Sequence, residues 1–471
     1  MSENQALEYS QSKAKRTTLM LVLISGAFAA ILNQTLLATA VPRIMIDMDL
    51  TESTAQWLNS VFMLVNGIMI PVTALLVGRF TTRQLFLFAL GLFGVGTVIC
   101  AIAPSFFILM AGRVIQAAGA GIIIPLMQTI LMLLYPVEKR GSAMGMFGLV
   151  IAFAPAIGPT LSGWLIDHYQ WRVLFLIIIP IVIIDVIVAY FLLRNVTEQT
   201  FPRVDVPSII MSTLGFGGLL YGFSAAGTDA GWGSPQVIIG IIAGAIILTM
   251  FILRQLKLEE PILEFRIFKY NTFVLATALG MVVFMAMIGA QTVLPILMQN
   301  MLGFSALQSG MALLPGAVVM GIMNPVTGRL FDKFGVKYLA LMGLTILAVT
   351  TFMFSTLSPD TSFAYIAILN AVRMLGVAMV LMPSTTASLN ELPNKVMPHG
   401  TAMNNTMRQI SGAVGTALMV TVMSNAALPD QGASGQIHGV NISFIVVGLI
   451  AVAGIVLALF MKSPRSSKNA G

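Results

Sequence analysis

The stretch RGSAMGMFGLVIAFAPAIG (Arg140–Gly158) recurs in altered form as HGTAMNNTMRQISGAVGTAL (His399–Leu418). Gly141 aligns with Gly400, a separation of 259 residues (400 − 141), and an Ala and a Met follow at the same separation. A match of this length, so far along the chain, predicts that the protein contains two related halves.

Four further matches occur at similar separations and in the same chain order. They are Gln34 with Gln291 (291 − 34 = 257), VGRF at Val77 with TGRL at Thr327 (327 − 77 = 250), Arg113 with Arg373 (373 − 113 = 260), and Pro125 with Pro383 (383 − 125 = 258). Each match alone is weak. Five matches in one order indicate an internal duplication.

The composition indicates that lipid surrounds most of the chain. Of the 471 residues, 57% are hydrophobic and 9% are charged, with a mean hydropathy of +0.93. A soluble domain carries about 25% charged residues. The net charge of +7 does not indicate nucleic-acid binding, because the basic residues lie in short gaps between apolar runs and form no basic face. Cys100 is the only cysteine, so no intramolecular disulfide is expected.

Fourteen segments have the length of about 20 apolar residues that a spanning helix requires. They are Thr18–Val41, Ala55–Val77, Gln84–Ala103, Phe106–Leu134, Ser142–Ile166, Val173–Leu193, Pro207–Ala226, Gln236–Leu256, Thr272–Met298, Gln308–Leu330, Lys337–Thr356, Phe363–Ala387, Thr401–Asn425 and Val440–Met461. Barrel strands are about ten residues long with alternating polarity, so these runs predict helices. We expect an all-α integral membrane protein.

The duplication and the spans together predict two pseudo-symmetric six-helix bundles with two inserted helices. The expected divisions are an N-terminal tail (1–17), an N-terminal bundle (18–199), two inserted helices (200–262), a C-terminal bundle (263–461) and a C-terminal tail (462–471). Parallel repeats with a site at their interface near mid-membrane are the layout of a transporter that works by rocking.

The basic residues predict the orientation. If the N-terminus is cytoplasmic, 20 of the 25 Lys and Arg residues fall in inside segments and two, Arg43 and Arg172, fall outside. The remaining three, at 113, 373 and 408, lie within spans. The positive-inside rule therefore predicts that both termini are cytoplasmic.

The link LEEPILEFRIFKYNTF before the ninth span mixes apolar residues with Arg266 and Lys269. One interpretation is that it lies along the inner membrane face. A plain polar linker is the alternative.

A loop motif, TGRLFDKFGVKYL (Thr327–Leu339), follows the tenth span. Its glycines permit a tight turn and close helix approach, and Asp332 can accept bonds from a helix N-terminus, which predicts a breakable cytoplasmic latch. The copy of this motif in the first half, VGRFTTRQL, has Thr82 where the second has its aspartate. The latch in the first half should therefore be weaker or made by other residues. The predicted cytoplasmic gate comprises Gly78, Arg79, Arg83, Gly328, Arg329, Asp332, Lys333 and Gly335.

Two motifs lie within spans. LMAGRVIQAAGAG in the fourth span carries Arg113 and Gln116, and an arginine so deep should face the bundle or a cavity. APAIGPTLSGW in the fifth span combines small residues, which permit close packing, with prolines, which bend a helix. The residues of this second motif are Pro155, Gly158, Pro159 and Gly163, with Ser162 in a glycine position.

These motifs resemble those of the major facilitator superfamily, and APAIGPTLSGW resembles its antiporter motif. Together with the fourteen spans and GTAMNNTMRQISGAVG, they resemble the fourteen-span drug:proton antiporters, the group that includes the QacA, EmrB and Lmr multidrug exporters. The resemblance covers Thr18 to Met461 and implies proton-driven export of amphipathic, often cationic, drugs and hence antibiotic resistance. It also implies that the antiporter motif seals the protein against leakage.

One position departs from that family. The first span reads ILNQTLLATAVP, with Asn33 where the family carries a titratable aspartate. Asparagine cannot bind and release a proton, so coupling must use another group or differ from the family. The alternative is an exporter of a lipid-like or anionic metabolite that is not coupled to protons in the usual way.

Asp185 is the only one of the 18 acidic residues that lies deep in a span, within PIVIIDVIVAY. An acid in hydrocarbon costs about 3 kcal/mol on insertion scales, so it should be functional, neutral or paired. We expect Asp185, with Arg113, to couple protons. The alternatives are a structural role, because the sixth helix of the family flanks the bundle, or coupling by Asp47, Asp49, Glu52 or Asp332.

Polar residues within the spans predict a mostly apolar substrate cavity with scattered polar groups. They are Asn33, Gln34, Asn66, Gln116, Gln128, Gln291, Asn324, Asn370, Asn404 and Arg408. The 32 methionines give repackable surface, although most should simply fill packing positions. So few internal acids favour neutral or singly charged substrates, and the arginines could favour anionic amphiphiles such as fatty acids.

Other classes of protein fit less well. His168, His399 and His438 lie in separate loops, so a catalytic cluster is not expected. No filter sequence indicates a channel, and no loop is long enough for a sensor domain. We expect a monomer in a bacterial plasma membrane, with amphipathic small molecules, protons and lipid as partners, and with no nucleic acid, metal or cofactor.

Overall fold

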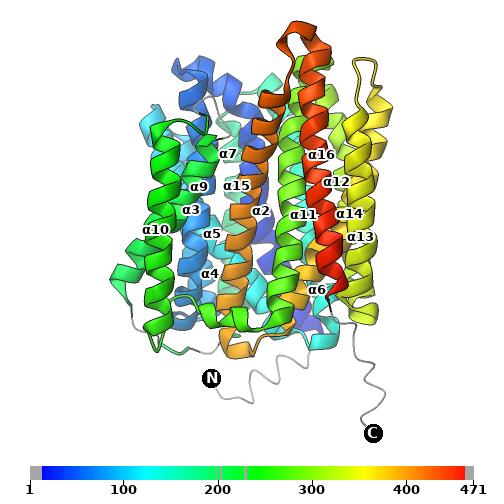
Figure 1. Cartoon of the computed structure of the whole chain (residues 1–471). Helices are drawn as coiled ribbons and strands as arrows, with labels where there is room; N and C mark the ends of the chain where they lie inside the picture. Colours follow the sequence, from blue (N-terminus) through cyan, green and yellow to red (C-terminus); the bar gives the residue numbers. More distant parts are fainter. Residues whose placement is uncertain (1–12, 198, 202–203, 227–230, 462–471) are drawn as a thin grey trace.

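The structure is a computed structural model that describes residues 13–197, 199–201, 204–226 and 231–461. Long helices run side by side through the full thickness of the molecule (Figure 1). They are α2 (Lys13–Met48), α3 (Glu52–Arg79), α4 (Thr82–Ala101), α5 (Phe106–Leu134), α6 (Arg140–His168), α7 (Val173–Leu176) continued by α8 (Ile178–Leu192), α9 (Val206–Ala226), α10 (Pro235–Lys257), α11 (Asn271–Ile296), α12 (Ala306–Phe334), α13 (Val336–Met353), α14 (Phe363–Asn390), α15 (Met397–Ala426) and α16 (Gly432–Leu459).

Short connections alternate the helix directions, so α2 begins and α16 ends on the same face of the molecule, the lower one in Figure 1. We call this the terminal face and the other the opposite face. Short helices lie at the turns and helix ends: η1 (Val137–Lys139), η2 (Phe265–Lys269), η3 (Leu297–Met301), η4 (Phe354–Thr356), η5 (Asn394–Val396) and η6 (Pro429–Gln431).

Local sequence signals define several helix boundaries. Capping boxes start α4, through Thr81 and Gln84, and α12, through Ser305 and Gln308. Gly335 ends α12 with a φ of 73°, in the left-handed region that glycine adopts without steric cost. The sharp turn from α12 to α13 therefore depends on this glycine.

Thirteen of the helical segments in the described part of the chain are long and apolar enough to cross a membrane. The first twelve and the last of the predicted spans correspond to them. The thirteenth predicted span lies in α15, which is helical throughout but does not reach the same hydropathy, because polar residues such as Asn404, Asn405 and Arg408 occupy its buried face. Lipid cannot solvate such a face, so other helices must cover it.

The same helix pairings occur before and after the inserted helices α9 and α10. We call the helices before α9 the first set and those after α10 the second set. In the first set α2 packs on α6, α5 and α8, while α4 packs on α5 and α8. In the second set α11 packs on α15, α14 and α16, while α13 packs on α14 and α16. Because these pairs match one to one in chain order, the packing follows the repeats found in the sequence.

Glycines permit close contact between α4 and α5 in the first set and between α13 and α14 in the second. A Cβ on Gly96 of α4 would lie 2.7 Å from the carbonyl oxygen of Gly112 on α5. A Cβ on Gly343 of α13 would likewise lie 2.7 Å from the carbonyl oxygen of Gly376 on α14. Both contacts lie close in sequence to an arginine, at 113 and 373, so in both sets a contact between two glycines joins this pair of helices.

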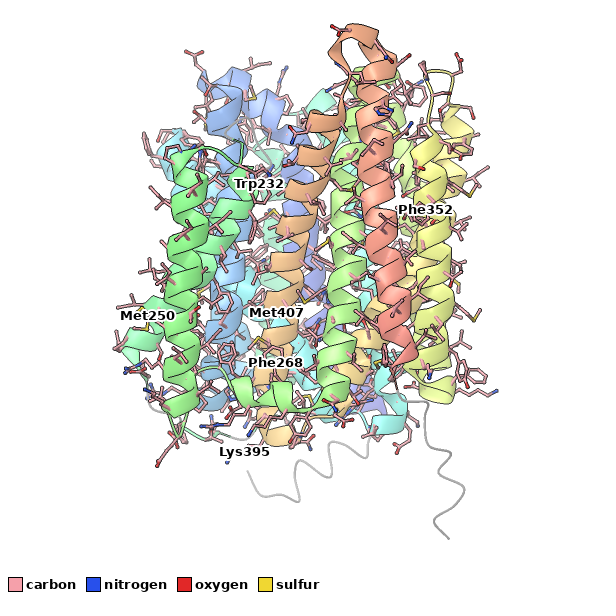
Figure 2. The ribbon with its side chains drawn as sticks, viewed as in Figure 1. Trp232, Met250, Phe268, Phe352, Lys395 and Met407 are labelled. Carbon is pink, nitrogen blue, oxygen red and sulfur yellow. The ribbon has the colours of Figure 1, made fainter. Side chains whose placement is uncertain are left out.

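The sets join each other mainly through α6 with α12 and α3 with α15, and to a smaller extent through α6 with α14 and α5 with α15. The inserted helix α9 packs on both α3 and α15, and so covers the second junction, while α10 lies outside it (Figure 1). The ring of Trp57 on α3 stacks on Tyr221 of α9 at 5.8 Å between centroids. Trp232, near the opposite-face end of this hairpin, donates to Thr421 Oγ1 of α15 at 2.5 Å (Figure 2).

The link before α11 does not spread its aliphatic side chains on the membrane surface. Ile262, Leu263 and Ile267 are buried by the protein itself. Phe265 packs edge-on against Phe251 of α10, and η2 thereby holds α10 to α11. These three side chains face neighbouring helix ends, and the position of the link along the inner membrane face stays a prediction.

Candidate functional site

The junction between α6 and α12 is sealed at the terminal face by Asp332. Its carboxylate accepts the backbone N–H groups of Gly141 and Ser142, each at 2.8 Å, and the Ser142 hydroxyl at 2.5 Å. These N–H groups lie in the first turn of α6, where no partner within the helix exists and the helix dipole favours an anion. Asp332 therefore caps a helix of the other set.

Backbone contact surrounds this cap. A Cβ on Gly328 would lie 2.3 Å from the carbonyl oxygen of Gly141, and one on Gly145 would lie 2.5 Å from that of Asn324. Arg140 extends the contact to the end of α14 by donating to Asn390 at 3.2 Å and, more weakly, to Asn394 at 3.4 Å. The molecule is thus closed at the terminal face along α6.

The equivalent loop in the first set makes different contacts. The Thr82 N–H donates to Asn195 at 2.9 Å, and Thr82 Oγ1 accepts from the Val196 N–H at 3.0 Å, so this loop is tied to the segment after α8. Arg83 lies 4.4 Å from the centroid of the Tyr190 ring, and Arg79 is exposed. The remaining predicted gate residues, Gly78, Arg329, Lys333 and Gly335, lie at the terminal-face ends of α3 and α12.

The residues that resemble the antiporter motif hold α6 against α2. A Cβ on Gly158 would lie 2.2 Å from Thr35 Oγ1, and Ser162 donates to the carbonyl of Leu36 at 2.7 Å. The serine in place of a glycine therefore adds a helix–helix hydrogen bond. Gly163, by contrast, has no atom within 4 Å of its Cβ position, and Pro155 is half-buried. Pro159 lies within α6, one residue beyond Gly158.

Arg113 is fully buried among neutral partners. It donates to Asn33 at 3.0 Å, to Gln116 at 2.6 Å and to the carbonyl of Leu58 at 3.2 Å, and its guanidinium lies over the Phe62 ring. The asparagine at the position where the family has an aspartate is thus its hydrogen-bond partner. An amide satisfies an N–H group there without neutralising the charge.

The other two arginines within spans are less well satisfied. Arg373 of α14 donates one Nη2 bond to the carbonyl of Ala286 on α11 at 2.5 Å. Arg408 of α15 lies over the Phe284 ring of α11. Nε and Nη1 of both arginines are buried without a hydrogen-bond partner among the described residues.

Asp185 lies at the middle of α8 and faces α2, away from the exposed Ile184 and Ile187. Its Oδ1 makes a hydrogen bond with the Ser25 hydroxyl of α2, and its Oδ2 is buried without a partner in the described chain. The structure does not bring Asp185 into contact with Arg113, whose partners are different residues. Asp185 and Arg113 therefore belong to two separate polar sites, one at Ser25 and the other at Asn33 of α2.

The predicted cavity residues fall into two groups. Gln34 is half-buried and Gln291, its repeat equivalent, is exposed. The others are buried between helices in this conformation: Asn33, Asn66, Gln116, Gln128, Asn324, Asn370, Asn404 and Arg408.

Several of the buried amides join helices. Gln128 of α5 accepts from Asn405 of α15 at 2.5 Å, a bond between the two sets. Asn324 of α12 donates to the carbonyl of Gly148 on α6 at 2.7 Å. Asn404 donates to Ser388 at 2.7 Å and, at 3.3 Å, to Thr277 within the second set.

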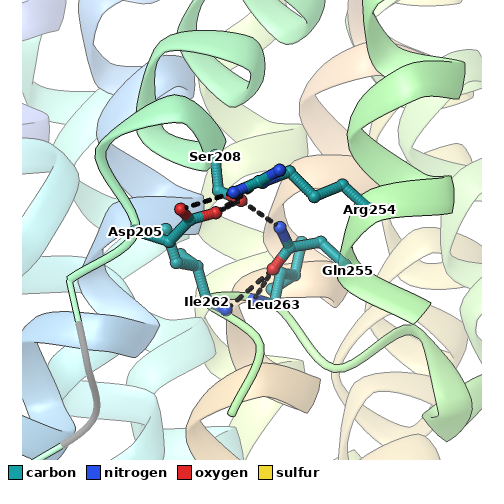
Figure 3. A network of polar contacts seen from close by, with 6 residues as sticks. All are labelled: Asp205, Ser208, Arg254, Gln255, Ile262 and Leu263. Carbon is teal, nitrogen blue, oxygen red and sulfur yellow. Dashed lines mark hydrogen bonds and ion pairs between the residues drawn. The ribbon is translucent and has the colours of Figure 1, made fainter. Parts of the chain in front are cut away.

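Figure 3 shows a polar network that fastens the inserted hairpin at the terminal face. Asp205 accepts two bonds from Arg254, at 2.7 and 2.8 Å, and one from Ser208. Gln255 donates to Ser208 and accepts from the N–H of Ile262 at 2.8 Å. The Arg254 bonds hold the pKa of Asp205 down at about 2. This network thus ties α9, α10 and the following link together.

At the opposite face, Asp47 accepts bonds from Trp171 and Arg172, at 2.9 and 3.0 Å. These bonds lower the pKa of the Asp47 carboxyl, which therefore stays ionised near neutrality.

The sequence did not predict a role for Ser25, Arg140 or Asn405. Ser25 contacts Asp185, and Arg140 and Asn405 join the two sets of helices. Ser25 has no distinguishing spacing, since its role depends on a helix 160 residues away in sequence. Asn405 could have been found from its place in the stretch that the repeat aligns, next to Asn404.

Paired six-helix repeats joined at a sealed junction, with buried polar residues inside, define a multi-pass membrane transporter and not an enzyme. The sequence profile of the Major Facilitator Superfamily matches residues 23–416. The chain is 50% identical over 458 residues to the uncharacterized MFS-type transporter YcnB of Bacillus subtilis, covering 97% of each chain. It is 40% identical over 456 residues to the lincomycin resistance protein LmrB of the same organism, covering 94% of this chain and 95% of LmrB.

A crystal structure of the human organic anion transporter MFSD10 superposes with a TM-score of 0.69, covering 95% of this chain and 100% of that one. At 13% sequence identity, this likeness shows the fold alone. The chain belongs to the Major Facilitator Superfamily. The predicted fold class and the resemblance to the Lmr and EmrB exporters are confirmed.

Proposed function

We propose that this protein is a proton-coupled antiporter that exports lipophilic and amphipathic drugs by alternating access. The observation that carries the proposal is the Asp332 cap on α6, because it closes the terminal face with a few bonds between the two sets of helices. Such bonds can be broken without unfolding either bundle. The similarity to LmrB supports drugs as the cargo.

In this mechanism the helices before α9 and those after α10 rock as two bodies. Polar side chains scattered on an apolar wall suit amphipathic cargo, and Gln34 and Gln291 are the accessible pair placed to contact it. We also propose that the protein is a monomer in a bacterial plasma membrane and that its terminal face is cytoplasmic.

Asp185 is the proposed proton carrier, and the geometry around Ser25 supports this role. The Ser25 oxygen lies 3.0 Å from the carbonyl of Val22 and also makes a hydrogen bond with Asp185 Oδ1. A hydroxyl has one hydrogen, so it can donate to only one of these two acceptors. A proton on Asp185 supplies the second hydrogen and removes a buried charge. When the proton leaves, the carboxylate needs water or a rearrangement of α2 against α8.

The test is uptake of a lipophilic dye into inverted vesicles, with and without an inside-acid pH gradient. We expect the gradient to drive uptake by the wild-type protein. Asp185→Asn mimics the protonated acid, so it should lose gradient-driven accumulation but retain exchange of labelled for unlabelled dye. The exposed acid Asp360 provides the matched control, and Asp360→Asn should behave as wild type.

Two outcomes separate the parts of the proposal. If the wild type takes up the dye equally with and without the pH gradient, proton coupling as a whole is contradicted. Full gradient-driven accumulation by Asp185→Asn contradicts only the assignment of the proton to this residue.

A further inference from the structure

A basic cavity opens at the terminal face, between the turn that joins α3 to α4 and the segment that follows α8. Its volume is about 420 Å³, which lies within the range of ligand-binding pockets. The residues that line it are Thr81, Arg83, Phe191, Leu193, Arg194 and Asn195. Two of these six residues are arginines and none is acidic, so the cavity favours an anion.

Contacts within the first set hold the two walls of this cavity together. The guanidinium of Arg83, on α4, lies 4.4 Å from the centroid of the Tyr190 ring on α8. Asn195, on the other wall, accepts the N–H of Thr82 at 2.9 Å and donates to the carbonyl of Thr197 at 2.9 Å. The α3–α4 turn and the segment after α8 therefore present their arginines to the same opening.

Both arginines lie at the edge of the predicted hydrocarbon layer. Arg83 immediately precedes the predicted span Gln84–Ala103, and Arg194 immediately follows the predicted span Val173–Leu193. Phe191, which also lines the cavity, is 75% exposed near the end of that second span, where lipid surrounds it. The cavity thus borders the lipid headgroups on one side and the acyl chains on the other.

We propose that Arg83 and Arg194 bind the phosphate of an anionic phospholipid, whose acyl chains lie against Phe191. Arginine donates strong hydrogen bonds to phosphate oxygens, and basic pockets between spanning helices on the cytoplasmic side bind anionic headgroups. A zwitterionic lipid also carries a phosphate, but it adds a cation that the arginines repel and that no lining carboxylate can accept. The inference uses the proposed cytoplasmic placement of the terminal face and does not depend on which drugs are exported.

The experiment measures lipid binding beside the cavity on full-length protein in phosphatidylcholine nanodiscs. Leu192→Cys, in a Cys100→Ser background, carries a bimane fluorophore at an exposed position two residues before Arg194. Phosphatidylglycerol or phosphatidylcholine with a nitroxide on one acyl chain is then titrated in, and the quenching of the fluorophore gives an apparent affinity for each lipid. We expect tighter binding of phosphatidylglycerol. Arg83→Gln and Arg194→Gln should each reduce this preference about fivefold, the effect of one basic residue at an anionic membrane surface.

A matched control separates this site from the general attraction of the basic face for anionic lipid. Lys257→Gln combined with Lys395→Gln removes two exposed charges elsewhere on the terminal face and should leave the preference at the fluorophore unchanged. Quenching by phosphatidylcholine should be the same in every variant, which checks that the surface around the fluorophore is intact. Equal affinity of the unsubstituted cavity for the two lipids overturns the inference, as does an equal loss of preference in the lysine control and the arginine variants.

Soluble glycerol phosphate distinguishes a lipid site from a site for free phosphate compounds. It lacks the acyl chains that contact Phe191, so an excess should not displace nitroxide-labelled phosphatidylglycerol. Displacement would show that the cavity binds soluble phosphates and would overturn the assignment to lipid. Both leaflets of a nanodisc contain the same lipids and no transport is measured, so failure of this inference leaves the proposed drug export intact.

Discussion

Asp332 and Ser142 belong to different halves of the repeat and are joined twice, because one carboxylate oxygen accepts both the backbone N–H at 2.8 Å and the hydroxyl at 2.5 Å. A hydrogen bond to a charged group contributes about 1.5–3 kcal/mol in proteins. A few such bonds can hold the terminal face closed and still be broken during each transport cycle.

Asp332→Asn keeps the shape of this cap and removes its charge. We expect the closed state of the terminal face to be destabilised by about 1–2 kcal/mol, the range for the stabilisation of a charge at a partly buried helix N-terminus. Dye uptake in inverted vesicles should fall about tenfold with normal expression. Glu391→Gln, which removes an exposed acid at the end of α14 on the same face, is the control. Unchanged uptake in Asp332→Asn contradicts the latch.

Glycine substitutions distinguish close helix contacts from open positions on the same helix. Gly158→Ala places a methyl group against Thr35 of α2, whereas Gly163→Ala meets no atom within 4 Å. Overpacking of this kind costs about 1–3 kcal/mol. We expect a lower unfolding temperature in detergent and reduced transport for Gly158→Ala, with Gly163→Ala close to wild type. The reverse order of the two variants would contradict the packing of α6 on α2.

Gly328→Ala tests the contact between the halves. Its Cβ would lie 2.3 Å from the Gly141 carbonyl oxygen, so α6 and α12 must separate at the terminal face. We expect a cysteine placed at Asn324, in a Cys100→Ser background, to react faster with a membrane-impermeant maleimide added from that face. Gly310→Ala, near the start of α12 with nothing within 4 Å, should leave the reaction rate unchanged.

The Asp205–Arg254 ion pair predicts a pH dependence of stability. The pKa of Asp205 is lowered to about 2, whereas an unfolded aspartate titrates near about 3.9. The folded state therefore binds fewer protons, and the contribution to stability is complete above about pH 5 and is lost as the pH falls toward 2. The difference in unfolding temperature between wild type and Asp205→Asn should be constant from pH 8 to 5 and narrow below pH 4. A difference that grows on acidification would contradict this assignment.

Much of the fold follows from the sequence, because spans and repeats are encoded in runs of residues. The fourteen segments and the Asp332 motif depend on local spacing, and the repeat is a match between two such local runs. The run of apolar residues at Thr401–Asn425 predicts the thirteenth span even though the buried face of that helix is polar. Local sequence also explains why α4 and α12 begin where they do.

The polar interior was less predictable, because its contacts join residues far apart in the chain. Asp185 stood out as a lone acid, but its partner Ser25 lies on another helix and carries no signal of its own. Asn33 was noted as a missing acid, yet its bond to Arg113 required the crossing of α2 and α5. The link before α11 shows the same limit, since its aliphatic residues are buried by helix ends that its own sequence does not specify.

Alternating access by two rocking bundles is the central claim, and paired distance measurements test it most directly. In a Cys100→Ser background, one sample carries spin labels at Lys139→Cys and Lys395→Cys on the terminal face, and a second carries them at His168→Cys and Asp360→Cys on the opposite face; all four positions are exposed. Pulsed electron–electron double resonance in proteoliposomes should show two distance populations for each pair of labels. As pH and substrate change, the terminal-face distance should lengthen whenever the opposite-face distance shortens. A single distance for both pairs, unchanged under conditions in which the protein transports dye, would contradict the claim.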